Sequence, residues 1–468
     1  VTKPSDILMA ARPQPHGLGK CVIVMASLAI YLTQVCRNRP RVSVRSGIKL
    51  DAKQASRHAS CVQSPQNSPR RSRYRGLIGG AQPVDKPGPI NMDDSAVMRY
   101  VFETNGTEAV EAKKRDFDCY FSSYAYLYHQ KEMLQDESRM AAYHGAIMSN
   151  PALFRNKTVL DVGAGTGVLS IWASKAGAQK VYAVEYTDMA KFAKRICAYN
   201  TPPGAIEVMQ GSAEKIELPS RVDVIVSEWM GMFLLRESML DSLIRVRDRL
   251  LKPDGLLFPS TATMLWSLVT AETEHSNASS ELNDAIRSWR PFTGTVSSMF
   301  GVNLEVLDKE FEDEQISYYM NQSRWVQLTP EDIVGYPMEI KSLDLNTVTL
   351  KDVRGVEKAR FRFEVESEVN ATGFAGWFTT HFPTGPDEAP PVVLSTSPEA
   401  GTTHWGQQYF PLREPMHLFA GDIVEGVMDM QRSNQTHRTY MVSATWKVHR
   451  AGENASGPPE YSKRWNME

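Results

Sequence analysis

The chain has 468 residues, 42% of them hydrophobic, and a formal net charge of −2. This length is enough for two or three domains with full-sized cores. Five cysteines without a CxxC pair or metal-ligand spacing exclude a disulfide-stapled scaffold and favour a reducing compartment. We therefore expect a protein of the cytoplasm and nucleus without a metal site.

Charge is distributed unevenly along the chain. Residues 1–84 carry fourteen Lys and Arg against two acids, which leaves 38 basic and 52 acidic residues in 85–468. An acidic surplus attracts basic partners and repels nucleic acid. We therefore expect basic protein partners and no direct binding of nucleic acid.

Residues 1–95 differ from the rest of the chain because their central part is rich in Arg and Ser. We interpret them as a disordered basic tail, with an organelle-targeting segment or normally untranslated sequence as open alternatives. The apolar run at 21–35 is shorter than the roughly 20 residues that a membrane helix needs. A signal anchor there is the weaker interpretation, so we expect no membrane association.

Residues 96–258 show the alternation of an α/β domain. Helix-like sequence from Tyr120 to Met148 precedes a strand, a glycine-rich turn and further strand–helix units. This pattern predicts a doubly wound, Rossmann-like parallel sheet with right-handed crossovers. The expected elements are strands at Thr158–Val162, Lys180–Glu185 and Val222–Ser227, a helix at Leu169–Ala176, a turn at Pro253-Asp254-Gly255 and a domain end near Pro259.

Residues 259–468 are rich in short β-like segments separated by turn residues, which predicts an antiparallel sandwich or barrel. The expected strands are Thr261–Thr270, Asp344–Leu350, Arg360–Val369, Gly376–Phe382 and Met441–His449. Residues 271–310 interrupt this pattern with helical sequence of mixed charge, which we interpret as an arm inserted in the β domain.

The turn after the first strand carries Gly163 and Gly165, which allow a tight turn and close approach of a ligand. Such turns serve dinucleotides as well as S-adenosylmethionine. Val168 stands where the dinucleotide fingerprint has its last glycine. Asp161 would repel a pyrophosphate but suits the ammonium group of a methionine moiety. The turn therefore favours S-adenosylmethionine over a dinucleotide.

Two further acids follow at positions suited to the same cofactor. Glu185 ends the second strand, where a carboxylate can accept both ribose hydroxyls in a doubly wound sheet. Glu214 precedes the next apolar strand, where it can meet the adenine amino group. Either acid alone could equally be a solvated residue at a strand end.

Two glutamates, Glu228 and Glu237, flank an unusually apolar loop after the strand that ends at Ser227. The carboxyl end of a central strand lies beside the cofactor crevice. A pair of carboxylates there matches a guanidinium, which presents donors on several edges of a rigid plane. The apolar residues between them argue against an ordinary solvated loop.

The segment SEWMGMFLLRESM at 227–239 resembles the double-glutamate loop of the protein arginine methyltransferases. The glycine turn resembles the first motif of that family, Tyr120-Phe-Ser-Ser-Tyr124 its cofactor-covering motif, and Thr403-His404-Trp405 its Thr-His-Trp loop. The match runs in the family's order from about residue 115 to 450. The sequence YHQKEML at 128–134 and the long arm are most similar to the plant branch.

The resemblance implies a role for each matching residue. Glu228 and Glu237 would clamp the substrate guanidinium, and His404, paired with Asp136, would take up the released proton. Arg139 would pair with the carboxylate of the methyl donor. Other implied contacts, in addition to those of Asp161, Gly163, Gly165, Glu185 and Glu214, are Gln130 and Met133 at the cofactor, and Tyr124, Met239 and Trp405 at the substrate.

The resemblance also implies a product and an assembly. Met133 and Met239 match the methionine pair of the asymmetrically dimethylating (type I) branch, so monomethylarginine and asymmetric dimethylarginine are expected. Met232 departs from the family, many members of which have tyrosine there, and Gln130 replaces a common histidine. The expected assembly is a homodimer that uses the arm, and the expected substrates are histones and Arg/Gly-rich proteins.

Two other functions use the same residues. One is a small-molecule methyltransferase on the same cofactor fold, against which the β domain and the double-glutamate loop weigh. The other is an inactive relative that only docks arginine-rich partners. The presence of Glu228, Glu237, Arg139 and Glu185 weighs against that interpretation.

Overall fold

The computed structural model describes residues 121, 124–385, 390–433, 436, 438–452 and 458–467. The tail expected over 1–95, with its apolar run, lies outside them. So do Tyr120, Ser122 and Ser123 of the cofactor-covering motif. None of the helices in the described ranges is long and apolar enough to cross a membrane.

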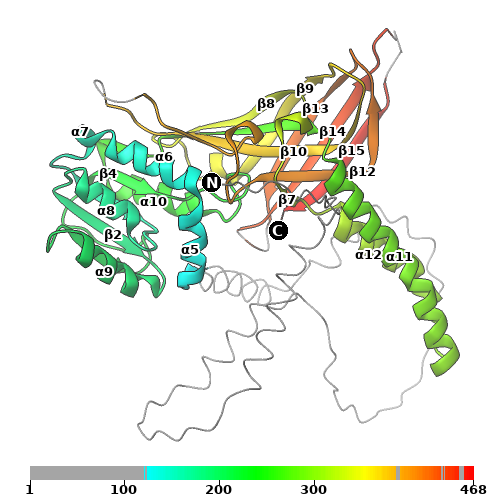
Figure 1. Ribbon diagram of the computed structural model, residues 1–468, viewed down its shortest axis with the longest axis horizontal. Helices are drawn as coiled ribbons and strands as arrows, with labels where there is room; N and C mark the ends of the chain where they lie inside the picture. The colour runs from blue at the N-terminus through cyan, green and yellow to red at the C-terminus, as the bar shows by residue number, and fades with distance from the viewer. Residues whose placement is uncertain are drawn as a thin grey trace, which may run out of the picture. The chain divides into compact units, whose positions relative to one another are not determined.

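The first part of the described chain is built on a five-stranded sheet in the order β3-β2-β1-β4-β5 (Figure 1). All its strand pairs are parallel, which confirms the predicted doubly wound sheet. The strands are β1 (Thr158–Val162), β2 (Lys180–Glu185), β3 (Ile206–Gln210), β4 (Val222–Ser227) and β5 (Leu251–Phe258). The central strands β1 and β4 are buried on both faces, as their near-continuous apolar sequence requires.

Six helices belong to this part of the chain. Helices α8 and α9 pack against β1, β2 and β3, and α10 packs against β4 and β5. The helices are α5 (Leu127–Gln135), α6 (Glu137–Met148), α7 (Pro151–Phe154), α8 (Val168–Lys175), α9 (Met189–Asn200) and α10 (Met239–Leu250). The helical stretch expected from Tyr120 to Met148 divides at Asp136, whose extended backbone ends α5 and whose carboxylate caps α6 through the amide of Arg139.

The second part consists of two antiparallel sheets, in the orders β7-β12-β10-β6-β8 and β15-β14-β13-β9, with β11 paired to β10. The strands are β6 (Thr261–Val269), β7 (Arg324–Val326), β8 (Ile333–Asp344), β9 (Gly355–Glu364), β10 (Val369–His381), β11 (Val393–Ser395), β12 (Gln407–Leu418), β13 (Ile423–Arg432), β14 (Tyr440–His449) and β15 (Glu460–Met467). Aromatic rings join the sheets: Phe374 of β10 stacks on Trp266 of β6 at 5.3 Å and meets Trp446 of β14 at 5.3 Å. The predicted antiparallel barrel is confirmed.

Several predicted boundaries in this part are wrong. The strand expected at Asp344–Leu350 is absent: Asp344 is the last residue of β8, and its carboxylate accepts bonds from the backbone and side-chain amides of Asn346, which end the strand. The strands expected at Arg360–Val369 and Gly376–Phe382 are instead the end of β9 with the start of β10, and the second half of β10.

The turn expected at Pro253-Asp254-Gly255 also has a different form. These residues lie within β5, where the pairing with β4 jumps from Leu251 to Leu256 while β4 advances by only two residues. The extra residues form a bulge, so turn-forming residues here distort a strand without ending it.

Two helices, α11 (Glu272–Phe300) and α12 (Asp308–Met320), occupy the place where the arm is expected. They pack against each other through Trp289, whose ring stacks on Phe311 at 4.1 Å and whose indole N–H bonds to Asp308 at 2.7 Å. The helical insertion therefore continues past residue 310 to Met320. Four short 3-10 helices complete the described elements, at Glu305–Leu307, Pro330–Asp332, Asp352–Arg354 and Pro398–Ala400.

Candidate active site

The glycine turn connects β1 to α8 through left-handed backbone at Gly163 (φ 76°) and Gly165 (φ 53°). Both positions are also crowded on the side where a side chain would stand. A Cβ on Gly163 would lie 2.5 Å from the Met239 terminal methyl group, and one on Gly165 would lie 2.7 Å from Oε1 of Gln130. The left-handed backbone therefore favours glycine at both positions, and the ends of the Met239 and Gln130 side chains border the turn.

Asp161 lies fully buried in β1 just before the turn. Its Oδ2 accepts bonds from the backbone amide and the hydroxyl of Ser170, at 3.0 and 2.6 Å, and so ties β1 to α8. Its Oδ1 is buried without a hydrogen-bond partner. Burial raises the pKa of Asp161 to about 7. One oxygen of this carboxyl is thus left for a donor from outside the protein.

Glu185 lies at the carboxyl end of β2, beside the same turn. Its Oε2 accepts a bond from the amide of Gly165 at 2.9 Å, and its Oε1 from the amide of Thr187 at 2.7 Å. A carboxylate has about four acceptor positions, so each oxygen can accept one more hydrogen. Glu185 is therefore an ordered, buried acceptor at the edge of the turn.

Glu214 is held elsewhere. Its carboxylate accepts the hydroxyl hydrogen of Ser242 at 2.8 Å and lies 3.8 Å from Arg245, both on α10. Among the hydrogen bonds and ion pairs of the described residues, none connects Glu214 to the glycine turn. Asp161, Glu185 and Gln130 each contact the turn or the helix that follows it, whereas Glu214 contacts α10.

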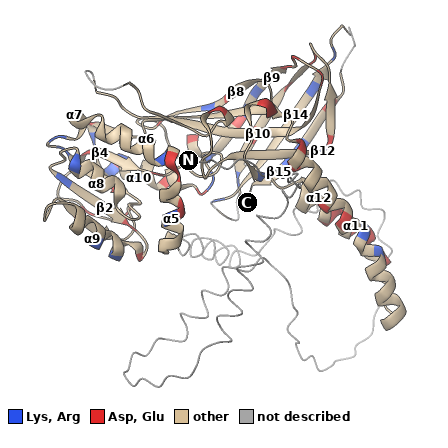
Figure 2. Cartoon of the chain, viewed as in Figure 1, with Lys and Arg blue, Asp and Glu red and all other residues tan. Residues whose placement is uncertain are grey.

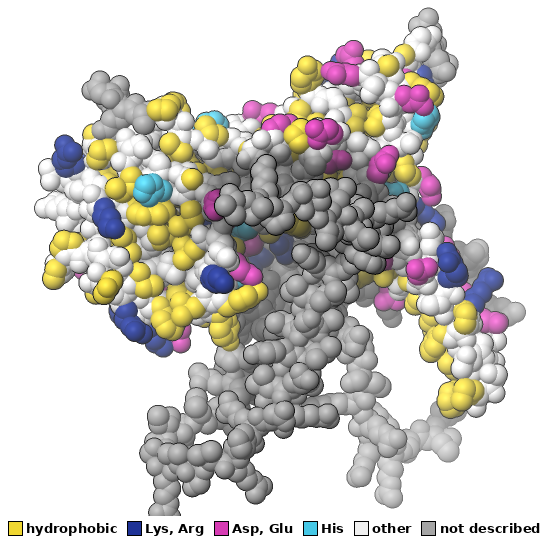
Figure 3. Space-filling view, in the orientation of Figure 1, with side chains coloured by type: hydrophobic (Ala, Val, Ile, Leu, Met, Phe, Trp, Pro, Cys, Tyr) yellow, Lys and Arg dark blue, Asp and Glu magenta, His cyan; other side chains and the backbone are white. Residues whose placement is uncertain are grey.

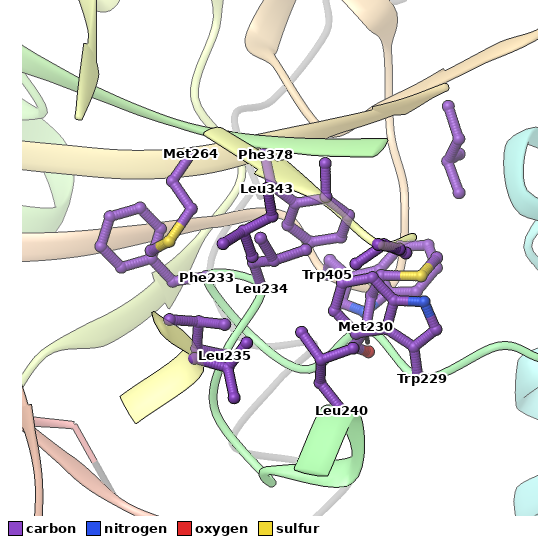
Figure 4. Packing of buried hydrophobic residues seen from close by; sticks show 14 of the residues in the cluster. Trp229, Met230, Phe233, Leu234, Leu235, Leu240, Met264, Leu343, Phe378 and Trp405 are labelled. Atoms are coloured by element: carbon purple, nitrogen blue, oxygen red, sulfur yellow. Dashed lines mark hydrogen bonds between the residues drawn. The ribbon is translucent and has the colours of Figure 1, made fainter. Parts of the chain in front are cut away.

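The double-glutamate loop follows β4 and is anchored by apolar side chains. Phe233, Leu234 and Leu235 are each 3% exposed or less and point into the core beneath the barrel (Figure 4). The indole N–H of Trp405, from the loop before β12, donates to the carbonyl of Met230 at 2.9 Å. This burial confirms that the loop is not an ordinary solvated one.

The same loop contains unusual backbone. Left-handed φ angles occur at Phe233 (46°), Leu234 (66°), Glu237 (77°) and Ser238 (56°). For residues other than glycine, such conformations cost about 1–3 kcal/mol each and persist where the surroundings enforce them. The buried anchors therefore hold the second glutamate in a conformation that a free loop would not keep.

Glu228, at the start of the loop, pairs with Arg139 of α6. Its Oε2 accepts from Nη2 at 3.0 Å and from Nε at 3.2 Å, and its Oε1 accepts from the amide of Met230 at 3.1 Å. Arg139 also donates from Nη1 to the carbonyl of Met133 at 3.0 Å. The guanidinium expected at the cofactor carboxylate is thus bonded to the first substrate glutamate.

Glu237, at the end of the loop, is held from two directions. Its Oε2 accepts the Tyr124 hydroxyl hydrogen at 3.1 Å. Its backbone amide donates to the carbonyl of Arg438 at 2.9 Å, and the Arg438 guanidinium donates to its carbonyl at 2.6 Å. The N-terminal segment and the β13–β14 connection therefore both position the second carboxylate.

His404 and Asp136 meet across 268 positions of sequence. Their Nδ1 and Oδ2 are 2.6 Å apart, and the His404 amide donates to the same oxygen at 2.9 Å. Burial opposes ionisation of Asp136, but the bonds from His404 and from the Arg139 amide outweigh it and lower the Asp136 pKa. The predicted pair is present, with an ionised carboxylate facing the imidazole.

Trp405, expected at the substrate, is only 3% exposed. Its indole donates to the loop carbonyl of Met230, as described above, and its ring meets Phe378 edge-on at 5.4 Å. The structure therefore gives Trp405 a position beneath the loop, from which it supports the loop backbone.

Comparison with known proteins places this site in a family. A family profile described as "Arginine methyltransferase oligomerization subdomain" matches residues 278–451, and one described as "Methyltransferase domain" matches residues 159–255. The protein arginine N-methyltransferase PRMT10 of Oryza sativa subsp. japonica is 44% identical over 364 residues, 77% of this chain and 95% of that protein. PRMT10 of Arabidopsis thaliana is 40% identical over 76% of this chain and 93% of its own length.

Solved structures of protein arginine methyltransferases are similar to this chain as well. The crystal structure of Arabidopsis protein arginine methyltransferase 10 superimposes with a TM-score of 0.71 at 38% identity, over 75% of this chain and all of that one. The Trypanosoma brucei PRMT1 enzyme–prozyme complex superimposes with a TM-score of 0.61 at 30% identity, over 74% of this chain. The chain belongs to the protein arginine N-methyltransferase family.

Membership of the protein arginine N-methyltransferase family gives the reaction its class. The protein is an S-adenosylmethionine-dependent enzyme that methylates arginine in proteins. The residues at the glycine turn fit this cofactor, because a buried carboxyl oxygen of Asp161 without a partner and the acceptor positions of Glu185 suit ammonium and hydroxyl donors.

Three residues that position this arginine methyltransferase site were missed by sequence reasoning. No sequence pattern near Arg438 indicates its role, because its partner Glu237 is about 200 positions away. His129 precedes Gln130 and meets the Tyr124 ring edge-on at 4.8 Å. His129 could have been found from the sequence, because it stands one residue before Gln130, where many family members have a histidine. Trp325 donates its indole N–H to the carbonyl of His404 at 3.1 Å, and only its place after the arm set it apart.

Proposed function

We propose that the enzyme forms monomethylarginine and asymmetric dimethylarginine, with Glu228 and Glu237 holding the substrate guanidinium. The placement of these carboxylates at the two ends of one anchored loop carries the proposal. Glu228 follows Ser227, which pairs with Val162 at the start of the glycine turn. At the other end, Met239 reaches Gly163. Both ends of the loop therefore border the cofactor turn.

In this proposal the cofactor lies over the glycine turn. Gly163 and Gly165 give it access to the backbone, Glu185 accepts the ribose hydroxyls, and Asp161 faces the ammonium group. Gln130 offers an amide near the ribose, Glu214 the adenine contact and Arg139 a contact to the carboxylate. When bound, S-adenosylmethionine supplies an electrophilic methyl group.

The two glutamates would orient and polarise the substrate. Glu228 keeps an acceptor position beyond those used by Arg139 and Met230, and Glu237 is oriented by the Tyr124 hydroxyl. Charge-assisted bonds to two edges of the guanidinium fix its plane. They also draw positive charge toward the bound nitrogens, which leaves electron density on the nitrogen that attacks.

His404 would receive the proton that the guanidinium loses. The lowered pKa of Asp136 keeps that carboxylate ionised, so the hydrogen between them belongs to Nδ1 of His404. With its hydrogen on Nδ1, the imidazole directs Nε2 away from Asp136, where it can accept a proton directly or through water.

The two methionines would decide the isomer. Met239 stands between the glycine turn and the loop, with its methyl group over Gly163. Met133 holds Arg139 through its carbonyl. We infer that they leave space for a second methyl on the nitrogen that received the first. Digestion of a fully methylated peptide and chromatography of its amino acids tests this, since a symmetric product would refute it.

We propose histones and Arg/Gly-rich proteins as substrates. The acidic surplus of residues 85–468 supports this, as do the exposed acids Glu132 and Glu137. Figure 2 shows acidic residues in red on α5. Incubating the full chain with labelled donor and either a histone mixture or an Arg/Gly-rich peptide tests the proposal. Absence of label on arginine in both would exclude these substrates.

We also propose a homodimer that uses the arm. The matching profile is that of an oligomerization subdomain. Hydrophobic side chains appear along the arm and at its end (Figure 3), and Phe300 and Val306 there are 70% and 79% exposed. A soluble protein seldom leaves such a surface uncovered. Sedimentation of Phe300→Ser should show more monomer, and Tyr336→Ser on β8 serves as the control.

Localisation to the cytoplasm and nucleus remains our expectation. The sparse cysteines and the basic protein substrates support it. Microscopy of a fluorescent fusion to the full chain tests it, and accumulation in another organelle would contradict it.

A further inference from the structure

Trp325 is a half-exposed tryptophan beside the loop that carries His404. It lies on β7, at the edge of the six-stranded sheet and directly after the arm. Its indole N–H is bonded to the carbonyl of His404, yet 50% of the side chain remains accessible to solvent. Bonding on one edge with exposure on the other distinguishes it from the buried tryptophans of the barrel.

The indole is held in one orientation. In addition to the bond to His404, its ring packs against Gly406, where a Cβ would lie 2.7 Å from Nε1 and 2.8 Å from Cε2. β7 pairs with β12 so that Trp325 stands opposite Gln408. A planar ring fixed in this way offers a preorganised surface to a ligand at little entropic cost.

A chain of bonds connects this surface to the proposed substrate site. Trp325 holds the carbonyl of His404, His404 holds Asp136, Asp136 caps the helix of Arg139, and Arg139 pairs with Glu228. The exposed indole therefore belongs to the same rigid set of groups as the carboxylates. A substrate that extends from Glu228 past His404 would therefore meet the ring.

The guanidinium of the neighbouring Arg324 does not stack on the Trp325 indole. Arg324 precedes Trp325 on the strand, so its side chain points to the opposite face. Its guanidinium lies over the ring of Tyr319, 6.0 Å from the centroid. Among the residues that the structure describes, Arg324 thus leaves the Trp325 ring to a cation from another molecule, and half of the side chain is exposed.

We propose that Trp325 binds a second arginine side chain of the substrate by cation–π stacking, while the target arginine occupies the site of Glu228 and Glu237. A guanidinium is the side chain that stacks best on an indole face. Substrates rich in arginine would supply both groups. This inference rests on the proposed function of the two glutamates and adds a preference for closely spaced arginines.

The test compares three glycine-rich peptides with the full-length enzyme. One contains a single arginine, one a second arginine, and one citrulline in place of that second arginine. Two target sites alone would double kcat/KM. We expect the unaltered enzyme to prefer the two-arginine peptide by a further factor of about 3 to 10, mainly through KM, and to show no such gain with citrulline.

Two substitutions separate stacking from support of His404. Trp325→Ala should reduce the preference to the statistical factor of about two, whereas Trp325→Phe should keep most of it, since it lacks the N–H but retains a ring. Tyr336→Ala, which removes an aromatic ring that is even more exposed on β8, should keep the full preference. If Trp325→Phe and Trp325→Ala both lower kcat on every peptide with the preference intact, Trp325 only positions His404 and the proposal fails.

The kinetics of the unaltered enzyme distinguish failure of the stacking proposal from failure of the proposed function. Turnover of both arginine peptides without a preference beyond the statistical factor overturns the stacking proposal alone. Turnover of neither overturns the proposed function and the stacking proposal together. If Trp325→Ala does not fold, Trp325→Phe and Trp325→Leu provide the same comparison, with the ring present in one and absent in the other.

Discussion

The two walls of the candidate site are built in different ways. The cofactor wall is local: Asp161, the glycine turn and Ser170 lie within ten residues and are held by one strand–turn–helix unit. The acceptor wall is assembled from distant parts of the chain, since Glu237 is held by Tyr124 and Arg438. A local wall is specified by backbone conformation, whereas an assembled wall depends on the packing of two domains.

This difference predicts different consequences of mutation. Changes at the turn should weaken binding of the donor with little effect on the acceptor groups. Changes at the loop should impair the chemical step, because the carboxylates act on the guanidinium. The following predictions test that separation, beginning with the largest expected effect.

Glu228→Gln should lower kcat by at least about 100-fold, because it removes the preorganised negative charge that faces the substrate guanidinium. We expect titration calorimetry to show donor affinity close to that of the unaltered enzyme. An equal loss of donor affinity would place Glu228 on the cofactor wall instead and would remove the distinction between the walls.

Asp136→Asn should lower kcat by roughly 10- to 100-fold, since the amide no longer stabilises a protonated His404. The pH profile should change as well, because the imidazole loses its anionic partner. A variant with normal kcat and an unchanged profile would show that His404 takes no part in proton uptake.

Asp136 should also affect stability in a defined pH range. Its folded-state pKa is lowered, so it lies below the value of about 3.9 in an unfolded chain. The stabilisation is therefore fully present above pH ~4 and is lost as pH falls through the folded pKa. Urea unfolding should show a difference between wild type and Asp136→Asn that is present at pH ~5 and shrinks as the pH falls below ~4. A difference that grows below pH ~4 would contradict this.

Gly163→Ala should weaken donor binding by about tenfold, because a Cβ there meets Met239 and the backbone is left-handed (φ 76°). Gly204→Ala is a matched control. Its φ is also left-handed, at 81°, but no atom lies within 4 Å of the added Cβ. If both variants bind the donor equally well, the turn does not shape the cofactor site.

Tyr124→Phe should have the smallest effect, a decrease of about 3- to 10-fold in kcat/KM, because one hydrogen bond to Glu237 is removed and its backbone anchors to Arg438 remain. Steady-state kinetics measure this. A loss as large as that of Glu228→Gln would mean that Tyr124 acts on the substrate itself.

The sequence predicted the local parts of the molecule well. The bounds of β1, β2 and β4 match the expected strands, because buried parallel strands are continuous apolar runs with clear ends. The barrel boundaries were less accurate. Asp344 ends a strand because of its own side-chain bonds, whereas Pro253 lies in a bulge within a strand, so turn-forming residues had different effects at the two places.

The site shows the same limit. Asp161, Gly163, Gly165 and Glu185 could be proposed from spacing alone, since one turn brings them together. The contact between Arg139 and Glu228, and that between Arg438 and Glu237, depend on how helices and strands of separate domains pack. Periodicity carries no information about such contacts, and only the family resemblance pointed to His404 and Asp136.

Fragmentation mass spectrometry of an arginine peptide methylated to completion by the full chain identifies both the modified side chain and the isomer. We expect two methyl groups on one terminal guanidino nitrogen, seen as loss of dimethylamine. Loss of monomethylamine from a dimethylated residue, or methyl groups on any side chain other than arginine, would contradict it.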